Sequence, residues 1–259
     1  MSIYQHYRKH EHPFVDQVLS WKDQVERSYT PYLTDFLDPR EQQIISSIIG
    51  TTNEQIKFAF FGGSESTERK RAIIAPYYEE IKEEDFDIQL LEASFQEKFI
   101  SIKHRDILGA FLGLGIDRKK IGDIIVVPNK FQLIIAQELS TYTILHLTKV
   151  NNASISLKEK PFSALLEKQE SWVDSTHTVS SLRLDVLVKE IYQMSRKDAL
   201  QLIQANRVKV NFTDVDDPAI QLMEGDLISV RGYGRSKLVR IDGKSRKNKT
   251  KVVTSRLKS

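Results

Sequence analysis

Cationic side chains stand at the predicted start of a short helix near the C-terminal end of the sequence. Ser195 and Asp198 have the spacing of a capping box, which predicts a helix that begins after Ser195. The first turn of a helix presents free backbone N–H groups and a partial positive charge. Arg196 and Lys197 add two full positive charges at the same point. This combination of residue types favours the binding of a phosphate group.

More cations follow on the next segment. The residues 206–211 read Asn-Arg-Val-Lys-Val-Asn, which predicts a turn into a strand. Alternation along that strand puts Val208 and Val210 on the buried face. Arg207, Lys209 and Asn211 then lie on the opposite face, where a polyanion could reach them.

Two further elements must position these cations. A short amphipathic helix begins at Arg183, and its apolar stripe consists of Leu184, Leu187, Val188 and Ile191. The triplet Glu224-Gly225-Asp226 predicts a tight turn into a strand at 227–231. We interpret Asp185 and Asp226 as structural residues that hold the helix start and the turn.

Charge is segregated along the chain. The net charge is +3, yet residues 231–259 carry 11 Lys or Arg against one acid, Asp242. Residues 1–230 hold 27 basic and 34 acidic side chains, so they are net acidic. Such segregation favours a polyanionic partner for the C-terminal end. The alternative is a solvated basic tail over 242–259 that only aids solubility.

Several of these positions together resemble a known module. The residues Arg183-Leu184-Asp185, Ser195-Arg196-Lys197, Arg207 to Asn211 and Gly225-Asp226 occur in an order and spacing similar to the ribosomal-protein-S-four (alpha-L) RNA-binding domain. In that family two helices and a small sheet bind structured RNA. The resemblance covers 181–241. Asn206 stands where the family usually has Gly, and Asn also tolerates the left-handed conformation required there.

The resemblance carries RNA contact onto Arg183, Ser195, Arg196, Lys197, Arg207 and Lys209. Asn211, Arg235 and Lys237 complete the predicted RNA-binding set. The alternative is that all of these are solvated charges on a small α+β domain.

The rest of the chain predicts an α+β protein with several parts. Residues 1–55 predict a helical region, and residues 56–150 an α+β domain with a mainly antiparallel sheet. Residues 151–180 are polar and predict a linker. The alpha-L domain is expected over 181–241 and a basic tail over 242–259.

Local patterns support these parts. In the first part, one helical face carries Phe14, Val18, Trp21 and Val25, and Asp38-Pro39 begins a second helix. In the middle part, strands are expected around 58–61, 72–75, 88–91 and 99–102, a helix over 104–116, and a hairpin of 124–127 with 133–136. Gly109 and Gly113 would allow a neighbouring element to approach that helix closely. A possible phosphate track comprises Arg105, Arg118, Lys119 and Lys120.

Segments outside the C-terminal domain look like those of bacterial YlmH-type proteins. They are 4–9 (YQHYRK), 33–41 (LTDFLDPRE), 104–116 (HRDILGAFLGLGI) and 121–125 (IGDII). The resemblance implies a middle domain with an RNA-recognition-motif-like fold. It also implies a role in ribosome-associated quality control, with rRNA of the large ribosomal subunit and tRNA as partners. Members are encoded beside cell-division genes, so cell-division proteins are a further candidate partner.

Motifs for catalysis are weak. No phosphate-binding loop and no dinucleotide-binding glycine pattern occur in the sequence. An RNA-modifying enzyme of the pseudouridine-synthase kind would need a catalytic aspartate, and Asp106 is the one candidate. A cell-division adaptor that binds protein through 1–55 is another alternative. We expect a non-enzymatic RNA-binding factor without catalytic residues or a cofactor.

Composition limits the remaining classes. The absence of cysteine excludes disulfides and cysteine-based zinc sites. His6, His10 and His12 lie too sparsely among other ligands to predict a metal site. No apolar stretch is long enough to cross a membrane, and the N-terminus lacks the core of a signal peptide. We therefore expect a cytoplasmic protein without membrane insertion.

Overall fold

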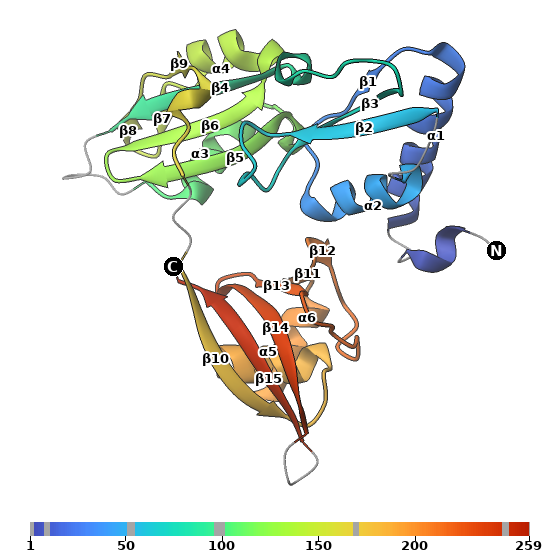
Figure 1. Cartoon of the computed structure of the whole chain (residues 1–259). Helices are drawn as coiled ribbons and strands as arrows, with labels where there is room; N and C mark the ends of the chain where they lie inside the picture. The colour runs from blue at the N-terminus through green and yellow to red at the C-terminus, as the bar shows by residue number, and fades with distance from the viewer. Residues whose placement is uncertain are drawn as a thin grey trace. The chain divides into compact units, whose positions relative to one another are not determined.

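The structure, a computed structural model, describes residues 3–7, 11–50, 55–95, 102–167, 171–244 and 249–258. The chain forms two compact units, residues 1–168 and residues 169–259. In Figure 1 the first unit runs from blue to yellow and the second from yellow to red. The expected α+β class is confirmed, since helices and antiparallel sheets occur in both units.

The first unit begins with two helices on a small sheet. Helices α1 (His12–Ser28) and α2 (Pro39–Ile49) pack on an antiparallel sheet in the order β1 (Tyr32–Leu33), β3 (Arg71–Pro76) and β2 (Ile56–Phe61). The Asp38 side chain accepts hydrogen bonds from the backbone of Arg40 and Glu41, and the Glu41 carboxylate accepts one from the Asp38 backbone. Asp38 and Pro39 therefore begin α2 as the sequence predicts.

The expected boundary between residues 55 and 56 is wrong. Ile56, Ala72 and Ile74 of the strands bury against α1 and α2, in the same cluster as Val18 and Ile45. Two helices alone would leave this apolar stripe in water, so the strands complete the first module. Residue 55 therefore marks a change from helix to strand within one core.

The next part has the strand order of an RNA recognition motif. Its elements are β4 (Ile88–Ser94), α3 (His104–Leu112), β5 (Ile121–Val127), β6 (Lys130–Ala136), α4 (Ser140–His146) and β9 (Lys158–Lys160). The sheet order β5-β6-β4-β9, with every neighbouring pair antiparallel, is that of a βαββαβ unit. The predicted hairpin is confirmed as β5 and β6. The strand predicted at 99–102 lies largely outside the described residues.

Short elements precede, connect and follow the strands of the first unit. They are η1 (Ile3–His6), η3 (Glu83–Phe86), η4 (Arg118–Lys120), η5 (Gln137–Leu139), η6 (Phe162–Ala164), and the pair β7 (Lys149–Val150) and β8 (Ala153–Ser154). The expectation for Gly109 and Gly113 is wrong. A Cβ at Gly109 would meet no atom within 4 Å, and one at Gly113 would meet only the backbone of its own helix.

Both faces of the central strands β4 and β6 are buried. Leu91 and Leu133 face the core that contains α3, whereas Leu90 and Ile134 face a second cluster. That second cluster includes Phe36 and Ile73 of the first module. An RNA recognition motif stacks bases on the sheet face opposite its helices. Here the first module covers that face.

The second unit packs two helices on one face of a six-stranded antiparallel sheet (Figure 1). The helices are α5 (Leu184–Tyr192) and α6 (Arg196–Gln204). The strands, in sheet order, are β10 (Trp172–Val179), β15 (Thr250–Leu257), β14 (Gly234–Lys244), β13 (Leu227–Val230), β11 (Val208–Val210) and β12 (Thr213–Asp214).

The expected linker and basic tail are wrong. Residues 153–160 belong to the first unit, and β10 pairs with β15 from Trp172 to Val179. Strand β15 lies between β10 and β14, and it buries Val252 and Thr254. A mostly exposed edge strand has the composition of a linker, and the charges around β15 obscured its alternation of buried and exposed residues.

Candidate nucleic-acid interface

A buried carboxylate joins the starts of the two helices in the second unit. The Asp185 side chain has no exposed area. It accepts hydrogen bonds from Arg183 Nε and Nη2 at 2.9 and 3.2 Å. It also accepts from Arg196 Nε and Nη2 at 3.1 and 2.9 Å. One carboxylate therefore fixes two guanidinium groups, and the group keeps a net positive charge.

The ionisation of Asp185 reflects this environment. Burial disfavours the charged carboxylate, but the hydrogen bonds from Arg183 and Arg196 outweigh it and hold the pKa of Asp185 below its usual range. Arg196 remains 60% exposed in its side chain, whereas Arg183 is 34% exposed. Arg196 therefore presents more of its side chain to a ligand.

The start of α6 is capped as predicted. Ser195 Oγ accepts a hydrogen bond from the Asp198 backbone at 3.1 Å and donates one to Asp198 Oδ2 at 2.7 Å. Ser195 thus caps α6, and its hydroxyl proton already forms a hydrogen bond with Asp198. Lys197 in the first turn is exposed and has no ion-pair partner among the described residues.

Asn206 adopts the left-handed conformation, with a φ of 53°, and turns the chain from α6 into β11. Val208 and Val210 are buried as predicted, and Lys209 is exposed between them. Arg207 is exposed just before the strand. The departure from the glycine of the alpha-L family therefore leaves the turn intact.

Cations line the outer face of the sheet. Lys209 pairs in register with Ser229, and Ser229 pairs with Arg235, so these three side chains share one face. A cleft of about 460 Å³ opens there, lined by Arg207, Lys209, Arg231 and Arg235 with Asp214 as the single acid. Lys209 Nζ lies 3.3 Å from Asp214. Lys237 is exposed two residues beyond Arg235 on the same strand.

Arg231 was missing from the sequence prediction. It follows β13 directly and lines the cleft with Arg207, because the Arg231 backbone N–H bonds to the Arg207 carbonyl at 2.9 Å. The signal that could have found it is the pairing of the predicted strand at 227–231 with the strand at 208–210. Arg256, another cation, lies 5.0 Å from the ring centroid of Tyr192.

Asn211 has a structural role in addition to its predicted RNA contact, which stays a prediction. Its side-chain amide donates to Asp226 Oδ1 at 2.7 Å and accepts from the Leu227 backbone at 2.9 Å. Asp226 also accepts from the Met223 backbone at 2.8 Å. Both side chains therefore hold the turn before β13. The interpretation of Asp226 as structural agrees with these bonds, and Asn211 belongs with it.

The alternative catalytic residue has a structural partner. Asp106 Oδ2 accepts a hydrogen bond from the Lys103 backbone at 2.9 Å at the start of α3. Among the described residues no three His, Asp or Glu side chains gather in a way that could hold a metal ion. His10 and the side chain of His6 lie outside the described residues. None of the described helices is both long and apolar enough to cross a bilayer.

The fold and the site define a protein that carries an RNA-binding module of the alpha-L class at its C-terminal end. The family model described as "S4 domain" matches residues 182–228. The model "YlmH, N-terminal" matches residues 10–79, and "Putative RNA-binding domain in YlmH" matches residues 82–164.

The chain belongs to the YlmH family. It is 41% identical over 256 residues to the "Ribosome-associated protein quality control protein P2" of Bacillus subtilis (strain 168), and the match covers 99% of each chain. A solved structure, "Cell division protein ylmH from Streptococcus pneumoniae", is 32% identical with a TM-score of 0.55. That match covers 64% of this chain and 100% of the solved one.

Proposed function

We propose that this protein is a non-enzymatic, cytoplasmic factor that binds structured rRNA and tRNA on the large ribosomal subunit. It would act in the quality control of stalled peptidyl-tRNA complexes. The observation that carries the proposal is the Asp185 group, in which one buried carboxylate fixes Arg183 and Arg196 at the starts of two helices. The relative in Bacillus subtilis, named as a ribosome-associated quality control protein, supports the ribosomal setting.

The mechanism is one of positioning. Arg196 presents a fixed guanidinium beside the start of α6, and a phosphate accepts such a fork in a bidentate manner. Lys197, Arg207 and Lys237 are exposed and add attraction to the backbone. The cleft lined by Arg207, Arg231 and Arg235 offers space for a nucleotide. The protein would hold an RNA conformation, and no bond is made or broken.

The test is direct RNA binding by the full chain. We define the alpha-L variant as Lys197→Glu/Arg207→Glu/Lys237→Glu, which spares Arg196 because that side chain stabilises the fold. The control variant Arg27→Glu/Lys82→Glu/Lys149→Glu makes the same charge change on exposed residues of the first unit. Affinity for rRNA from large subunits and for tRNA is measured by fluorescence anisotropy at several salt concentrations.

We expect the alpha-L variant to bind at least tenfold more weakly with a shallower salt dependence, since each lost phosphate contact removes about one unit of slope. The control should bind as the wild type does. Equal affinity of the alpha-L variant and the wild type would refute the proposal.

The name of the solved relative raises a second candidate, a cell-division adaptor. It predicts a protein partner that binds through residues 1–55, that the compact unit 1–168 containing them retains, and that RNase does not release. A modified nucleotide in rRNA or tRNA that depends on this protein and on Asp106 would instead support the enzymatic alternative.

A further inference from the structure

Two arginine side chains converge on one backbone oxygen in the first unit. Arg118 Nη1 donates to the Ile121 carbonyl at 2.7 Å, and Arg69 Nε donates to the same oxygen at 3.1 Å. Arg69 Nη2 also donates to the Phe36 carbonyl at 2.8 Å. Arg69 belongs to the module of α1 and α2, and Arg118 to the RNA-recognition-motif-like part. The pair therefore stands at the seam between them.

Neither guanidinium has an ion-pair partner within 4 Å in the part of the chain that the structure describes. The nearby Asp123 carboxylate accepts the backbone N–H groups of Glu68 and Arg69, both at 3.0 Å. Glu41, Asp38, Asp123 and Glu68 act on Arg69 at longer range, and Asp123 also acts on Arg118. The pair is thus held in place by neutral carbonyl groups, with the carboxylates farther away.

This environment lowers the pKa of both side chains. Burial lowers the pKa of Arg69. Burial together with the positive charge of Arg69 lowers the pKa of Arg118 to about 10. An anion beside the pair would offset this unfavourable charge.

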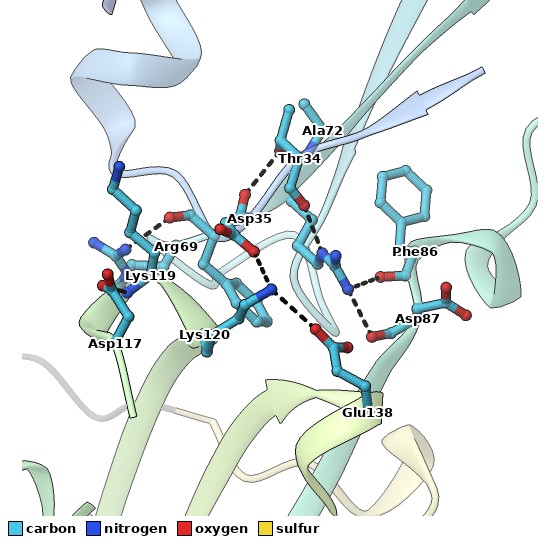
Figure 2. A network of polar contacts seen from close by, with 12 residues as sticks. Thr34, Asp35, Arg69, Ala72, Phe86, Asp87, Asp117, Lys119, Lys120 and Glu138 are labelled. Atoms are coloured by element: carbon cyan, nitrogen blue, oxygen red, sulfur yellow. Dashed lines mark hydrogen bonds and ion pairs between the residues drawn. The ribbon is translucent and has the colours of Figure 1, made fainter. Parts of the chain in front are cut away.

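The neighbouring cations Lys120 and Arg71 have other partners in the same network. Lys120 lies between Asp35 and Glu138, at 2.7 and 3.0 Å (Figure 2). Figure 2 shows Arg69 and Lys119 at one end of this network, with Phe86 and Asp87 at the other. Arg71 is buried and donates to the carbonyls of Thr34, Phe86 and Asp87. Lys120 and Arg71 are therefore structural.

Several N–H donors of the pair have no partner in the protein. A guanidinium has five N–H donors, and the bonds above use two from Arg69 and one from Arg118. Among the described residues, the one buried side-chain polar atom without a partner is Thr143 Oγ1. The nitrogens of Arg69 and Arg118 that lack a partner are therefore not fully buried, and both residues are half-buried. Lys119, next to Arg118, is exposed as well.

We propose that Arg69 and Arg118 form an oxyanion site that binds a phosphate group of an RNA backbone. The site spans the seam of the first unit, and Lys119 adds attraction to it. The usual base-stacking face of the middle domain is covered by the first module, so RNA reaches this part of the chain by another surface. The inference extends the proposed function by a second RNA contact, separate from the alpha-L domain.

The test compares Arg118→Gln with Arg27→Gln, an exposed arginine on α1, in the full chain. Affinity for large-subunit rRNA is measured against salt, in the wild type and in the alpha-L variant. We expect Arg118→Gln to lower affinity five- to tenfold and the salt slope by about one in both backgrounds. Arg27→Gln should change affinity less than twofold. Arg118→Lys keeps the charge without the fork, so it should fall between wild type and Arg118→Gln.

A second measurement needs no variant. Arginine Nε–H signals of the ¹⁵N-labelled wild type are followed while inorganic phosphate replaces chloride at constant ionic strength. Saturable shifts of the Arg69 and Arg118 signals are expected, together with loss of those shifts when rRNA occupies the site.

Two results would overturn the proposal. One is an unchanged rRNA affinity of Arg118→Gln while the alpha-L variant loses binding. That result would contradict the site at Arg69 and Arg118 but agree with the proposed function. The other is phosphate shifts that rRNA does not displace, which indicates a site for free phosphate only. Weaker binding by Arg118→Gln but not by the alpha-L variant would support the pair and refute the proposed function.

Discussion

Asp185 and Arg196 lie on two different helices, yet one oxygen of the carboxylate, Oδ2, accepts both Nε and Nη2 of the guanidinium, at 3.1 and 2.9 Å. The same carboxylate binds Arg183 at the start of its own helix. This contact fixes the helix pair of the second unit and aims a cation at the solvent. The buried Asp185 therefore stabilises the helix pair and also orients Arg196, a proposed RNA contact.

Replacing Asp185 with Asn should lower the free energy of unfolding of the second unit by about 2–3 kcal/mol. The change removes the charge that the two arginines share and weakens hydrogen bonds at a fully buried position. Urea unfolding monitored by Trp172 fluorescence measures the loss. The exposed Asp216→Asn is the control, with a change within about 0.5 kcal/mol. An Asp185→Asn chain as stable as the control would contradict this account.

Acidification should weaken the contact of Asp185 with Arg183 and Arg196. A carboxylate whose folded pKa is depressed stabilises the fold fully above its unfolded value, about 4. That stability is lost as the pH falls through the folded pKa. The wild type should therefore lose stability below about pH 4 more steeply than Asp185→Asn. Parallel curves of unfolding free energy against pH for the two chains would show that Asp185 makes no such contribution.

Deleting residues 244–259 should unfold the second unit. Strand β15 pairs on both sides, with β10 and with β14, and Val252 is part of the core. Its loss leaves β10 without a partner, exposes one edge of β14 and opens the core to water. Trp172 fluorescence and near-ultraviolet circular dichroism should lose their cooperative transition. A basic tail would instead be removable with an unchanged unfolding curve.

Gly122→Ala should destabilise the first unit by about 1–3 kcal/mol, because overpacking strains a filled core. A Cβ at Gly122 would lie 2.7 and 3.0 Å from two carbons of the Phe36 ring, which is 1% exposed. Gly109→Ala is the matched control, since its Cβ would meet no neighbour. That change should stabilise the helix by up to about 1 kcal/mol. Thermal unfolding followed by Trp21 fluorescence distinguishes the two.

Asn211→Ala separates stability from binding. The two side-chain hydrogen bonds of Asn211 hold the turn at Asp226, so the variant should lose about 1–2 kcal/mol of stability. Its affinity for rRNA, measured on the folded fraction, should stay within twofold of wild type. A large loss of affinity without a loss of stability would restore Asn211 to the RNA-binding set.

Much of the second unit could be predicted from the sequence, because its signals are local. The cap at Ser195, the buried alternation of Val208 and Val210, and the left-handed turn at Asn206 each depend on a few neighbouring residues. The role of Asp185 was predicted only in part. Its bond to Arg183 is local, whereas its bond to Arg196 requires the packing of two helices.

Long-range pairing could not be predicted. The strands β10 and β15 were obscured by polar and basic composition, and their partners are distant in sequence. The convergence of Arg69 and Arg118 depends on how two modules pack, which no local pattern encodes. The same packing buries the second face of the middle sheet.

The most direct test of the central claim is sucrose-gradient sedimentation of cell extract at low and high salt. It compares the wild type with the alpha-L variant and with the matched control in the first unit. The account predicts that the wild type and the control sediment with the large ribosomal subunit at low salt, and that the alpha-L variant stays at the top. Wild type at the top of the gradient at both salt concentrations would contradict it.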